Sequence, residues 1–168
     1  MRRISFSSTL IVGDSITRFV ANYSRHPVLC KPGWTIQWAR QLLLWESDRK
    51  LLVHYTRVVV HVGTNNLERL GGRETAKQLQ ELREELALAF PTKTFFLSAV
   101  IPRKDHLQEE AFICSRLTSK HGGFFAKALL SKGKVKGGML KRDKLHLTLE
   151  GAMAFAKSLD GWLASLPH

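Results

Sequence analysis

Three short motifs contain residue types that together could carry out nucleophilic catalysis. A Gly-Asp-Ser sequence ends at Ser15, a Gly-Thr-Asn-Asn sequence occupies 63–66, and Asp143 stands three residues before His146. A carboxylate at that spacing can accept one imidazole N–H and leave the other ring nitrogen free as a base. A nucleophilic hydroxyl, an oriented base and amide donors for a developing oxyanion are the groups that acyl transfer needs.

Each motif alone also has an ordinary structural explanation. Ser15 could simply cap a helix, and the Gly and Asn residues at 63–66 could simply form a turn. The residues around Ser15 match neither a Gly-x-Ser-x-Gly nucleophile elbow, because position 17 is Thr17, nor a phosphate-binding loop. The remaining histidines are interpreted as structural, namely His26, His54, His61, His106, His121 and His168. Among these, His61 lies in a predicted strand close to the site.

The elements that must position these motifs follow from the apolar pattern. Short apolar, partly β-branched runs predict strands at 9–12, 27–30, 58–62, 95–100 and 124–125. Residues with helical periodicity and capping positions predict helices at 16–23, 35–47, 73–90, 109–119 and 148–163. This alternation predicts a mostly parallel sheet with helices on both faces, and active sites of such sheets lie beyond the carboxyl ends of the strands.

The chain is strongly basic. Among 168 residues there are 26 Lys and Arg against 14 Asp and Glu, so the formal net charge is +12. Most of this surplus lies in one stretch whose only anion is Asp143 and whose cations are Arg116, Lys120, Lys127, Lys132, Lys134, Lys136, Lys141, Arg142 and Lys144. Such a surplus favours nucleic acid, an anionic membrane surface or an acidic substrate as partner, although a basic surface can also serve solubility alone.

The cysteine and apolar patterns exclude several protein classes. Cys30 and Cys114 form no disulfide framework and have no zinc-ligand spacing, so we expect an intracellular chain with reduced thiols and no metal. No run of 18 apolar residues exists, and the short apolar segment before Ser15 leads directly into the candidate site. We therefore expect neither a membrane span nor a signal peptide, and one domain over 1–168.

The motifs together resemble the conserved blocks of the SGNH, or GDSL, hydrolases. The matching segments are Ile-Val-Gly-Asp-Ser-Ile at 11–16, Pro-Gly at 32–33, Gly-Thr-Asn-Asn at 63–66 and Asp-Lys-Leu-His at 143–146. Their order and spacing agree with the family, and the resemblance covers essentially the whole chain. It implies a flavodoxin-like, three-layer α/β/α fold with a five-stranded parallel sheet.

The same resemblance implies the hydrolysis of esters through an acyl-serine intermediate. Position by position, it assigns Ser15 as the nucleophile, His146 as the general base and later the acid, and Asp143 as the residue that orients His146. It assigns the backbone N–H groups of Ser15 and Gly33 and the Asn65 side chain to the oxyanion hole. No metal or cofactor is implied, and the substrate is an ester.

Two features depart from the family pattern. Asn66 stands where the family usually has an aspartate, and 120–142 is unusually basic and glycine-rich. The basic chain and the Gly-Asp-Ser-Ile-Thr-Arg motif are similar to the esterase domains in first-open-reading-frame proteins of LINE-type retrotransposons. That narrower resemblance implies a domain from a longer protein with RNA-binding and self-association segments elsewhere. It implies acetyl or lipid esters as substrates and a location in the cytoplasm, at membranes or in a ribonucleoprotein particle.

Three tryptophans lie on or beside the predicted helix at 35–47, at a spacing that places them on one face: Trp34, Trp38 and Trp45. That face is either buried or forms a rim that contacts lipid. On the second interpretation, the residues expected to contact lipid or another anionic surface are Trp34, Trp38, Lys132, Lys134, Lys136, Lys141 and Arg142. An alternative function for the whole chain is a degenerate hydrolase fold that serves as a nucleic-acid- or membrane-binding module. Acyl transfer to an acceptor other than water is equally compatible with the motifs.

Overall fold

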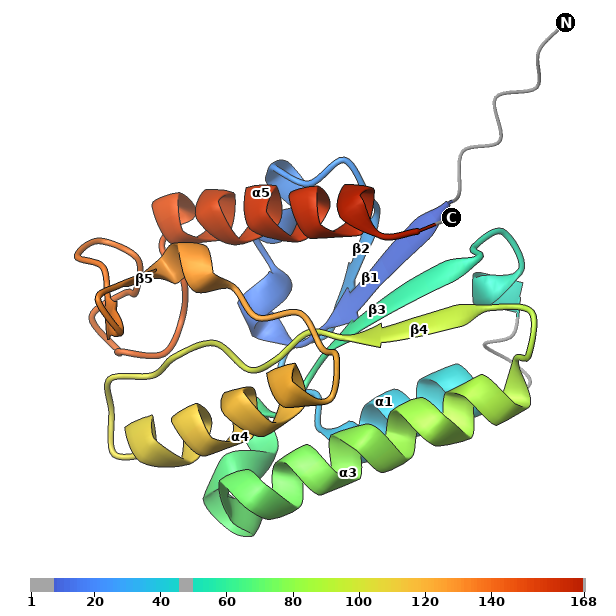
Figure 1. Cartoon of the computed structure of the whole chain (residues 1–168), viewed down its shortest axis with the longest axis horizontal. Helices are drawn as coiled ribbons and strands as arrows, with labels where there is room; N and C mark the ends of the chain where they lie inside the picture. Colours follow the sequence, from blue (N-terminus) through green and yellow to red (C-terminus); the bar gives the residue numbers. More distant parts are fainter. Residues whose placement is uncertain (1–7, 46–49, 168) are drawn as a thin grey trace, which may run out of the picture.

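Four parallel strands form the central sheet (Figure 1). They are β1 (Thr9–Gly13), β2 (Val28–Cys30), β3 (Arg57–His61) and β4 (Thr94–Leu97), in the spatial order β2-β1-β3-β4. The computed structural model describes residues 8–45 and 50–167. The two central strands, β1 and β3, consist largely of buried β-branched and apolar residues, as expected for strands covered on both faces.

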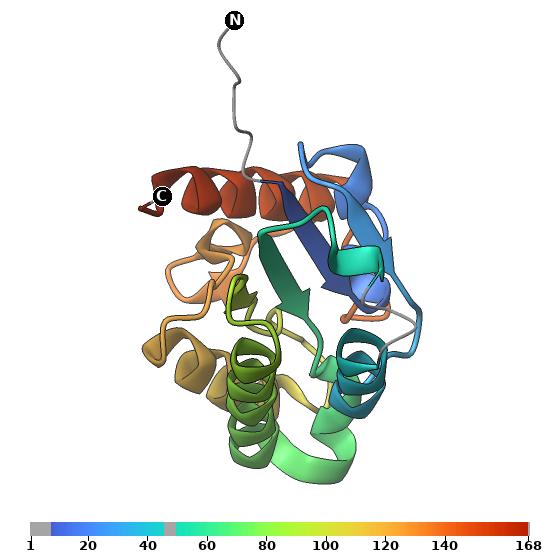
Figure 2. The ribbon, with the colours of Figure 1, turned by 90° about the vertical axis from the view of Figure 1, so that its right-hand side faces the viewer.

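Helices cover both faces of the sheet. They are α1 (Ile36–Leu44), α3 (Leu67–Ala89), α4 (Gln108–Lys120) and α5 (Leu149–Ser165). Val12 and Val60 belong to the core layer beneath α1, α3 and α4, whereas Ile11 and Val59 belong to the layer beneath α5. Figure 2 shows α5 on one side of the sheet and α1 and α3 on the other. The three-layer α/β/α architecture expected from the sequence is therefore confirmed.

The expected fifth strand is reduced to a single parallel bridge between Ser98 and Phe124. The Ala99 N–H donates to the Phe124 carbonyl at 2.7 Å, and the Phe124 N–H donates to the Leu97 carbonyl at 2.8 Å. The chain then turns at once into the short helix η4 (Lys127–Leu129), so no further ladder bonds form. The prediction of a five-stranded sheet is wrong by this strand, although Phe124 occupies the expected edge position.

Two expected helices differ from the structure. The segment 16–23 forms two 3-10 turns, η1 (Ser15–Thr17) and η2 (Val20–Asn22), in place of a continuous helix. The helix expected after Gly72 begins earlier, at Leu67, and is interrupted at Gly71, whose φ of 74° is not helical. The next residue, Gly72, packs closely against α4. A Cβ at this position would lie 2.4 Å from the Glu110 carbonyl oxygen, so only glycine permits this approach of α3 to α4. Part of the helix expected at 35–47 lies outside the described residues.

The basic stretch between α4 and α5 contains little regular structure. Its only strands in the described chain are β5 (Leu130–Ser131) and β6 (Lys134–Val135), which form an antiparallel hairpin. Thr148 caps α5, since its hydroxyl accepts the Gly151 N–H at 3.0 Å.

Among the described residues, no helix combines the length and hydropathy that a membrane crossing requires.

Candidate active site

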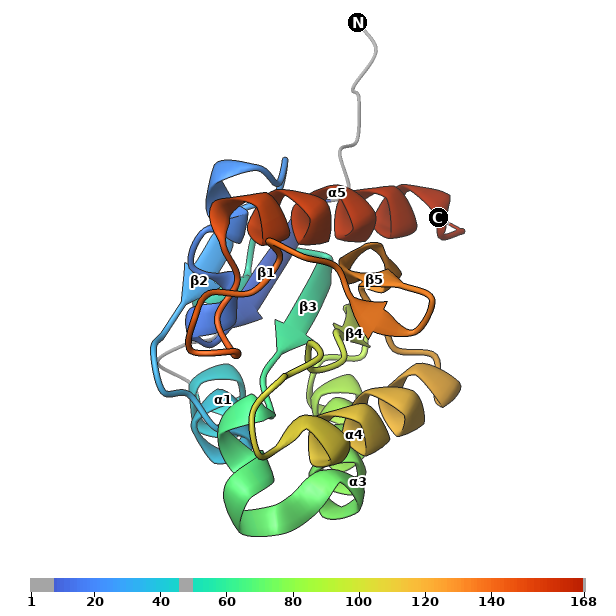
Figure 3. The same ribbon diagram turned by 90° about the vertical axis from the view of Figure 1, so that its left-hand side faces the viewer.

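The loops that carry the motifs leave the sheet at the carboxyl ends of its strands. Gly13, the last residue of β1, pairs with Cys30 of β2 and His61 of β3. Two backbone bonds extend this register past the strands: the Lys31 N–H donates to the Gly13 carbonyl at 2.9 Å, and the Asp14 N–H donates to the His61 carbonyl at 3.2 Å. Figure 3 looks onto this end of the sheet and shows the loop before α5 beside the segment that follows β1.

Ser15, His146 and Asp143 form a continuous hydrogen-bonded chain. The Ser15 Oγ lies 3.0 Å from the His146 Nε2, and the His146 Nδ1 lies 2.5 Å from the Asp143 Oδ2. Ser15 and His146 are 131 residues apart in sequence. With the Nδ1 proton held by the carboxylate, Nε2 is the ring nitrogen that can accept the serine proton. The three residues assigned from the motifs are therefore brought together in the geometry of a nucleophile, a base and its orienting carboxylate.

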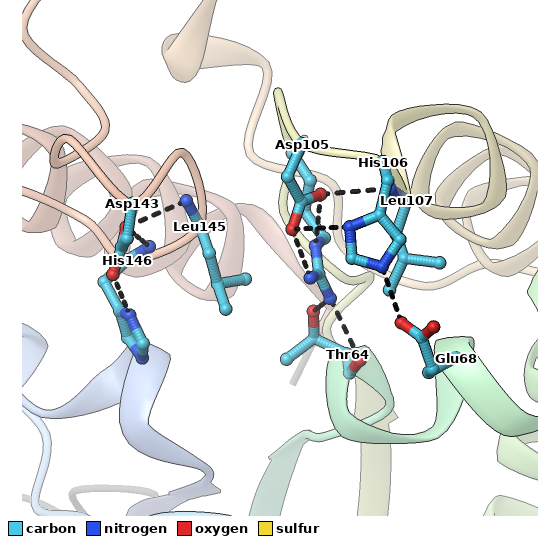
Figure 4. Close-up of polar contacts among 9 residues, drawn as sticks. Thr64, Glu68, Asp105, His106, Leu107, Asp143, Leu145 and His146 are labelled. Carbon is cyan, nitrogen blue, oxygen red and sulfur yellow. Dashed lines mark hydrogen bonds and ion pairs between the residues drawn. The ribbon is translucent and has the colours of Figure 1, made fainter.

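A tight turn makes the Asp143–His146 pair compact (Figure 4). The Asp143 Oδ1 accepts the backbone N–H groups of Leu145 at 3.0 Å and His146 at 2.9 Å. Lys144 completes the turn in the left-handed region, with a φ of 63°. Partial burial raises the pKa of Asp143, but the hydrogen bonds from the His146 ring and from the two N–H groups outweigh it and lower the pKa to about 2. The carboxylate is therefore ionised at any pH near neutrality.

The groups expected in the oxyanion hole lie on the neighbouring loops. The Asn65 Nδ2 donates to the Trp34 carbonyl at 2.9 Å, which fixes this side chain against the turn that contains Gly33. Gly33 has a φ of 77°, a conformation that favours glycine. Within the described part of the chain, the N–H groups of Ser15 and Gly33 donate to no protein acceptor. These two N–H groups and the second amide hydrogen of Asn65 are therefore free to bind an oxyanion.

Comparison with solved structures identifies the fold. A protein described as a lipolytic member of the G-D-S-L family from Desulfitobacterium hafniense DCB-2 superposes with a TM-score of 0.72 at 14% identity, covering 93% of this chain and 99% of that one. A protein described as an acylhydrolase from Bacteroides fragilis matches with a TM-score of 0.72 at 17% identity, covering 96% and 88%. The fold is that of the GDSL hydrolases. No family model and no curated protein matches the sequence itself.

Asn66, the departure from the GDSL pattern, has a structural role in this chain. It is buried, its Oδ1 accepts the Ile36 N–H at 3.0 Å, and its Nδ2 donates to the Gln37 Oε1 at 3.0 Å. An aspartate could accept the first bond but could not donate the second. The asparagine therefore ties the loop after β3 to the first turn of α1.

Arg103 is a residue of the site that the motif analysis missed. Its buried guanidinium donates to the Thr64 carbonyl at 3.3 Å and to the Thr64 Oγ1 at 3.2 Å. It also pairs with Asp105, with the closest N–O distance at 2.5 Å. The hydrogen bond from Arg103 holds the pKa of Asp105 below its ordinary value. Arg103 thus clamps the loop that carries Asn65, and its position in an apolar Val-Ile-Pro-Arg run was the available signal.

Asp14, next to the nucleophile, is a buried carboxyl group with one unsatisfied oxygen. Its Oδ1 accepts the Ile16 N–H at 3.0 Å, whereas Oδ2 has no hydrogen-bond partner among the described residues. Burial raises the pKa of Asp14 to about 7, because a charged carboxylate loses its hydration there. The hydrogen bond from Ile16 opposes this rise only in part.

The Asp14→Asn variant should therefore change how stability depends on pH. Since the folded-state pKa exceeds the ordinary value of 3.8, the folded protein retains a proton that the unfolded chain releases. Stability consequently falls as the pH rises from about 4 to 7, and this part of the fall should disappear in Asp14→Asn, whose side-chain oxygen still accepts from Ile16. Urea unfolding at several pH values measures the free energy of unfolding, and Glu84→Gln on the exposed face of α3 is the control. An unchanged pH profile in Asp14→Asn would contradict the assignment.

The residues expected to contact lipid lie in different places. Trp38 and Trp45 are exposed at 58% and 62%, whereas Trp34 packs in part against the core. Lys141 and Arg142 are exposed in the loop next to the turn that contains Asp143 and His146. The exposed lysines Lys132 and Lys134 belong instead to the β5–β6 hairpin and its turn, and the exposed Lys136 directly follows β6. Within the described ranges, no group of His, Cys, Asp and Glu side chains could hold a metal ion.

Proposed function

We propose that this protein is a serine carboxylic-ester hydrolase. The observation that carries the proposal is the chain of contacts from the Ser15 Oγ to the His146 Nε2 at 3.0 Å and from the His146 Nδ1 to the Asp143 Oδ2 at 2.5 Å. The likeness in fold to proteins described as lipolytic proteins and acylhydrolases supports the same reaction class.

The reaction on these residues proceeds in two halves. The Ser15 Oγ attacks the ester carbonyl carbon while its proton moves to the His146 Nε2. The resulting oxyanion collapses, the bond to the alcohol oxygen breaks, and His146 returns the proton to that oxygen, which leaves an acyl-serine and a free alcohol. A water molecule then attacks the acyl carbonyl while giving a proton to His146. Cleavage of the Ser15 ester restores the Oγ–H and releases the carboxylic acid.

The Asn65→Ala variant tests the oxyanion hole. Loss of one preorganised donor should lower kcat by about 10²–10³-fold with a much smaller change in KM, because the oxyanion forms only along the reaction. The fold should survive, since Asn65 is exposed and its side chain makes one hydrogen bond, to Trp34. Asn22→Ala, an exposed asparagine away from the site, is the matched control. A kcat within threefold of wild type would remove Asn65 from the oxyanion hole.

We propose that the acyl chain of the substrate extends from the site into a groove of about 880 Å³ between α4, the 102–106 loop and the β5–β6 hairpin, whose lining residues include neither Ser15 nor His146. Apolar side chains on three sides line it, namely Pro102, Phe112, Phe125, Leu130 and Val135. Hydrogen bonds connect the lining of the groove to the loops of the candidate site. The lining residue Arg103 donates to the Thr64 carbonyl, and the N–H of the lining residue Lys104 donates to the Lys144 carbonyl at 3.0 Å. An apolar groove of this size favours lipid or longer acyl esters over acetyl esters.

Exposed aromatic and cationic residues support action at an anionic membrane surface. Trp38 and Trp45 are exposed on α1, Phe112 is 60% exposed at the groove, and the net charge is +12. Tryptophan favours the boundary between lipid and water, and cations are attracted to anionic headgroups over about a Debye length.

A series of 4-nitrophenyl esters with acyl chains from two to twelve carbons tests the proposed activity and the groove. We expect kcat/KM to rise with chain length, because each additional methylene that enters the groove contributes about 0.8 kcal/mol at most. A decline from the two-carbon ester onward would restrict the enzyme to acetyl esters. The absence of hydrolysis at every length would contradict the proposed function.

The same series with vesicles tests the membrane surface. Anionic vesicles should raise the rate on long-chain esters, neutral vesicles should not, and added salt should reduce the effect. Trp38→Ala should weaken the activation, whereas Leu88→Ala, which removes an 84% exposed side chain near the end of α3, should retain it. Equal activation by neutral and anionic vesicles would exclude a role for the basic surface.

A further inference from the structure

Two cations lie over one aromatic ring beside the proposed catalytic residues. The Arg18 Cζ is 5.2 Å from the centroid of the Phe19 ring, and the Lys141 Nζ is 5.0 Å from the same centroid. Phe19 itself packs against the core layer beneath α5, so the ring is held in place. Cation–π attraction therefore orients both side chains at a fixed part of the surface.

Backbone hydrogen bonds connect Arg18 to Ser15 and Lys141 to His146. Arg18 ends the turn that begins at Ser15, and its N–H donates to the Ser15 carbonyl at 3.2 Å. The Lys141 N–H donates to the His146 carbonyl at 2.8 Å. The contact with Phe19 thus joins the loop after β1 to the loop before α5, the two segments seen side by side in Figure 3. These bonds fix the backbone of each cationic residue relative to Ser15 or His146.

Neither cation has a carboxylate partner in the part of the chain that the structure describes. Asp143, the nearest anion in sequence to Lys141, uses both oxygens to bind His146 and Leu145. Other arginines in the protein are neutralised, as Arg40 is by Glu85 at 2.9 Å and Arg103 by Asp105. Two like charges gathered on one ring without a counter-ion repel each other, and an anion bound between them would relieve that repulsion.

We propose that Arg18 and Lys141, held over Phe19, bind a phosphate group of the substrate and so select esters whose alcohol part carries a phosphate. This inference rests on the proposed esterase function and names its substrate class. The arginine fork can donate two hydrogen bonds to phosphate oxygens, and the lysine adds a compact charge with rotatable donors. The acyl groove and this cationic site involve different residues, so one ester could occupy both.

Kinetics on a matched pair of soluble esters tests the proposal. The probes are 1-butyrylglycerol and 1-butyrylglycerol 3-phosphate, which share the scissile bond and differ by the phosphate. The readout is the ratio of kcat/KM for the phosphorylated ester to that for the neutral one. We expect a ratio above about ten in wild type, because hydrogen bonds to charged groups are the strong ones, and a decrease of the ratio with salt.

Variants locate the source of this preference. Arg18→Gln and Lys141→Gln should each lower the ratio by about fivefold, and the double variant should bring it close to one. Arg18→Lys and Lys141→Arg keep the charge and should retain part of the preference. Lys157→Gln, which removes an exposed charge from α5, is the matched control and should leave the ratio at its wild-type value. A ratio that persists in the double variant would overturn the proposal.

Binding to the Ser15→Ala protein separates this inference from the esterase function. Calorimetric titration should show tighter binding of the phosphorylated ester, and the preference should vanish when Arg18→Gln and Lys141→Gln are added. Equal binding of the two esters, or turnover at equal kcat/KM, would overturn the phosphate site while the esterase function stands. Preferential binding without turnover by the wild-type protein would contradict the esterase function and leave the phosphate site intact.

Discussion

Ser15→Ala should abolish ester hydrolysis, with a loss in kcat of about 10⁴-fold or more. The Ser15 Oγ is the only hydroxyl in the described chain that contacts His146, so no other side chain can supply the attacking oxygen in this geometry. Wild-type protein should also react with a fluorophosphonate probe, with the mass of the adduct on the peptide that contains Ser15. Both signals should be absent in the variant.

The fold should be unaffected by this change, which makes the result interpretable. Among the described residues, the Ser15 Oγ makes a hydrogen bond only to the ring of His146, and alanine fits any space that serine occupies. Circular dichroism and thermal unfolding check the fold, and Ser131→Ala, an exposed serine of β5, controls for the loss of a hydroxyl. Labelling that persists in Ser15→Ala would contradict the assignment of the nucleophile. A wild-type protein that neither labels nor hydrolyses would favour a hydrolase fold that serves in binding.

Asp143→Asn should lower kcat by about 10³–10⁴-fold. The asparagine amide can donate to Nδ1, which would place the imidazole proton on Nε2 and remove the base from Ser15. The new side chain also lacks the charge that stabilises the imidazolium formed during the reaction. Steady-state kinetics over a range of pH measures the loss, and Glu84→Gln, the exposed residue of α3 used above, is the charge-matched control. A kcat within tenfold of wild type would exclude Asp143 from the orienting role.

The lowered pKa of Asp143 also predicts how the wild-type protein responds to acid. With a pKa of about 2 against an ordinary value of 3.8, the group contributes stability that is fully present above pH 4 and is lost as the pH falls through about 2. Protonation of Asp143 should therefore not limit activity between pH 4 and pH 8. A carbon-13 NMR titration of the Asp143 carboxyl measures this directly, and a midpoint above pH 4 would contradict the expectation.

The sequence predicted the architecture because its strongest signals are local. Buried β-branched runs such as Val58 to Val60 specify central strands, and a parallel sheet necessarily gathers the loops after those strands at one edge. The Asp143–His146 pair is local as well, since a carboxylate three residues before a histidine can reach its ring within one turn. These local patterns singled out Ser15, Asp143 and His146 as candidates, and the joint resemblance of the motifs to the GDSL hydrolases predicted their roles.

The predictions of secondary structure were wrong at two segments where other contacts outweigh the local apolar pattern. Phe124 was expected to continue a strand, but the chain turns into η4 after it, and its ring packs against Phe155 and Trp162 of α5. The segment after Ser15 has the apolar spacing of a helix, yet Asp14 binds the Ile16 N–H and the Thr17 hydroxyl binds the Asp14 carbonyl, which favours a tight 3-10 turn.

The sequence by itself therefore predicted the alternation of strands and helices and singled out Ser15, His146 and Asp143 as candidate catalytic residues. Each of these predictions depends on neighbours in the chain or on the rule that parallel strands end at the same side of a sheet. Only the tertiary structure revealed that Arg103 clamps the Asn65 loop, that Asn66 ties this loop to α1, and that Arg18 and Lys141 meet over Phe19. The physical reason is that these contacts join segments far apart in the chain. Their partners are set by packing in three dimensions, which residue types and spacing do not encode locally.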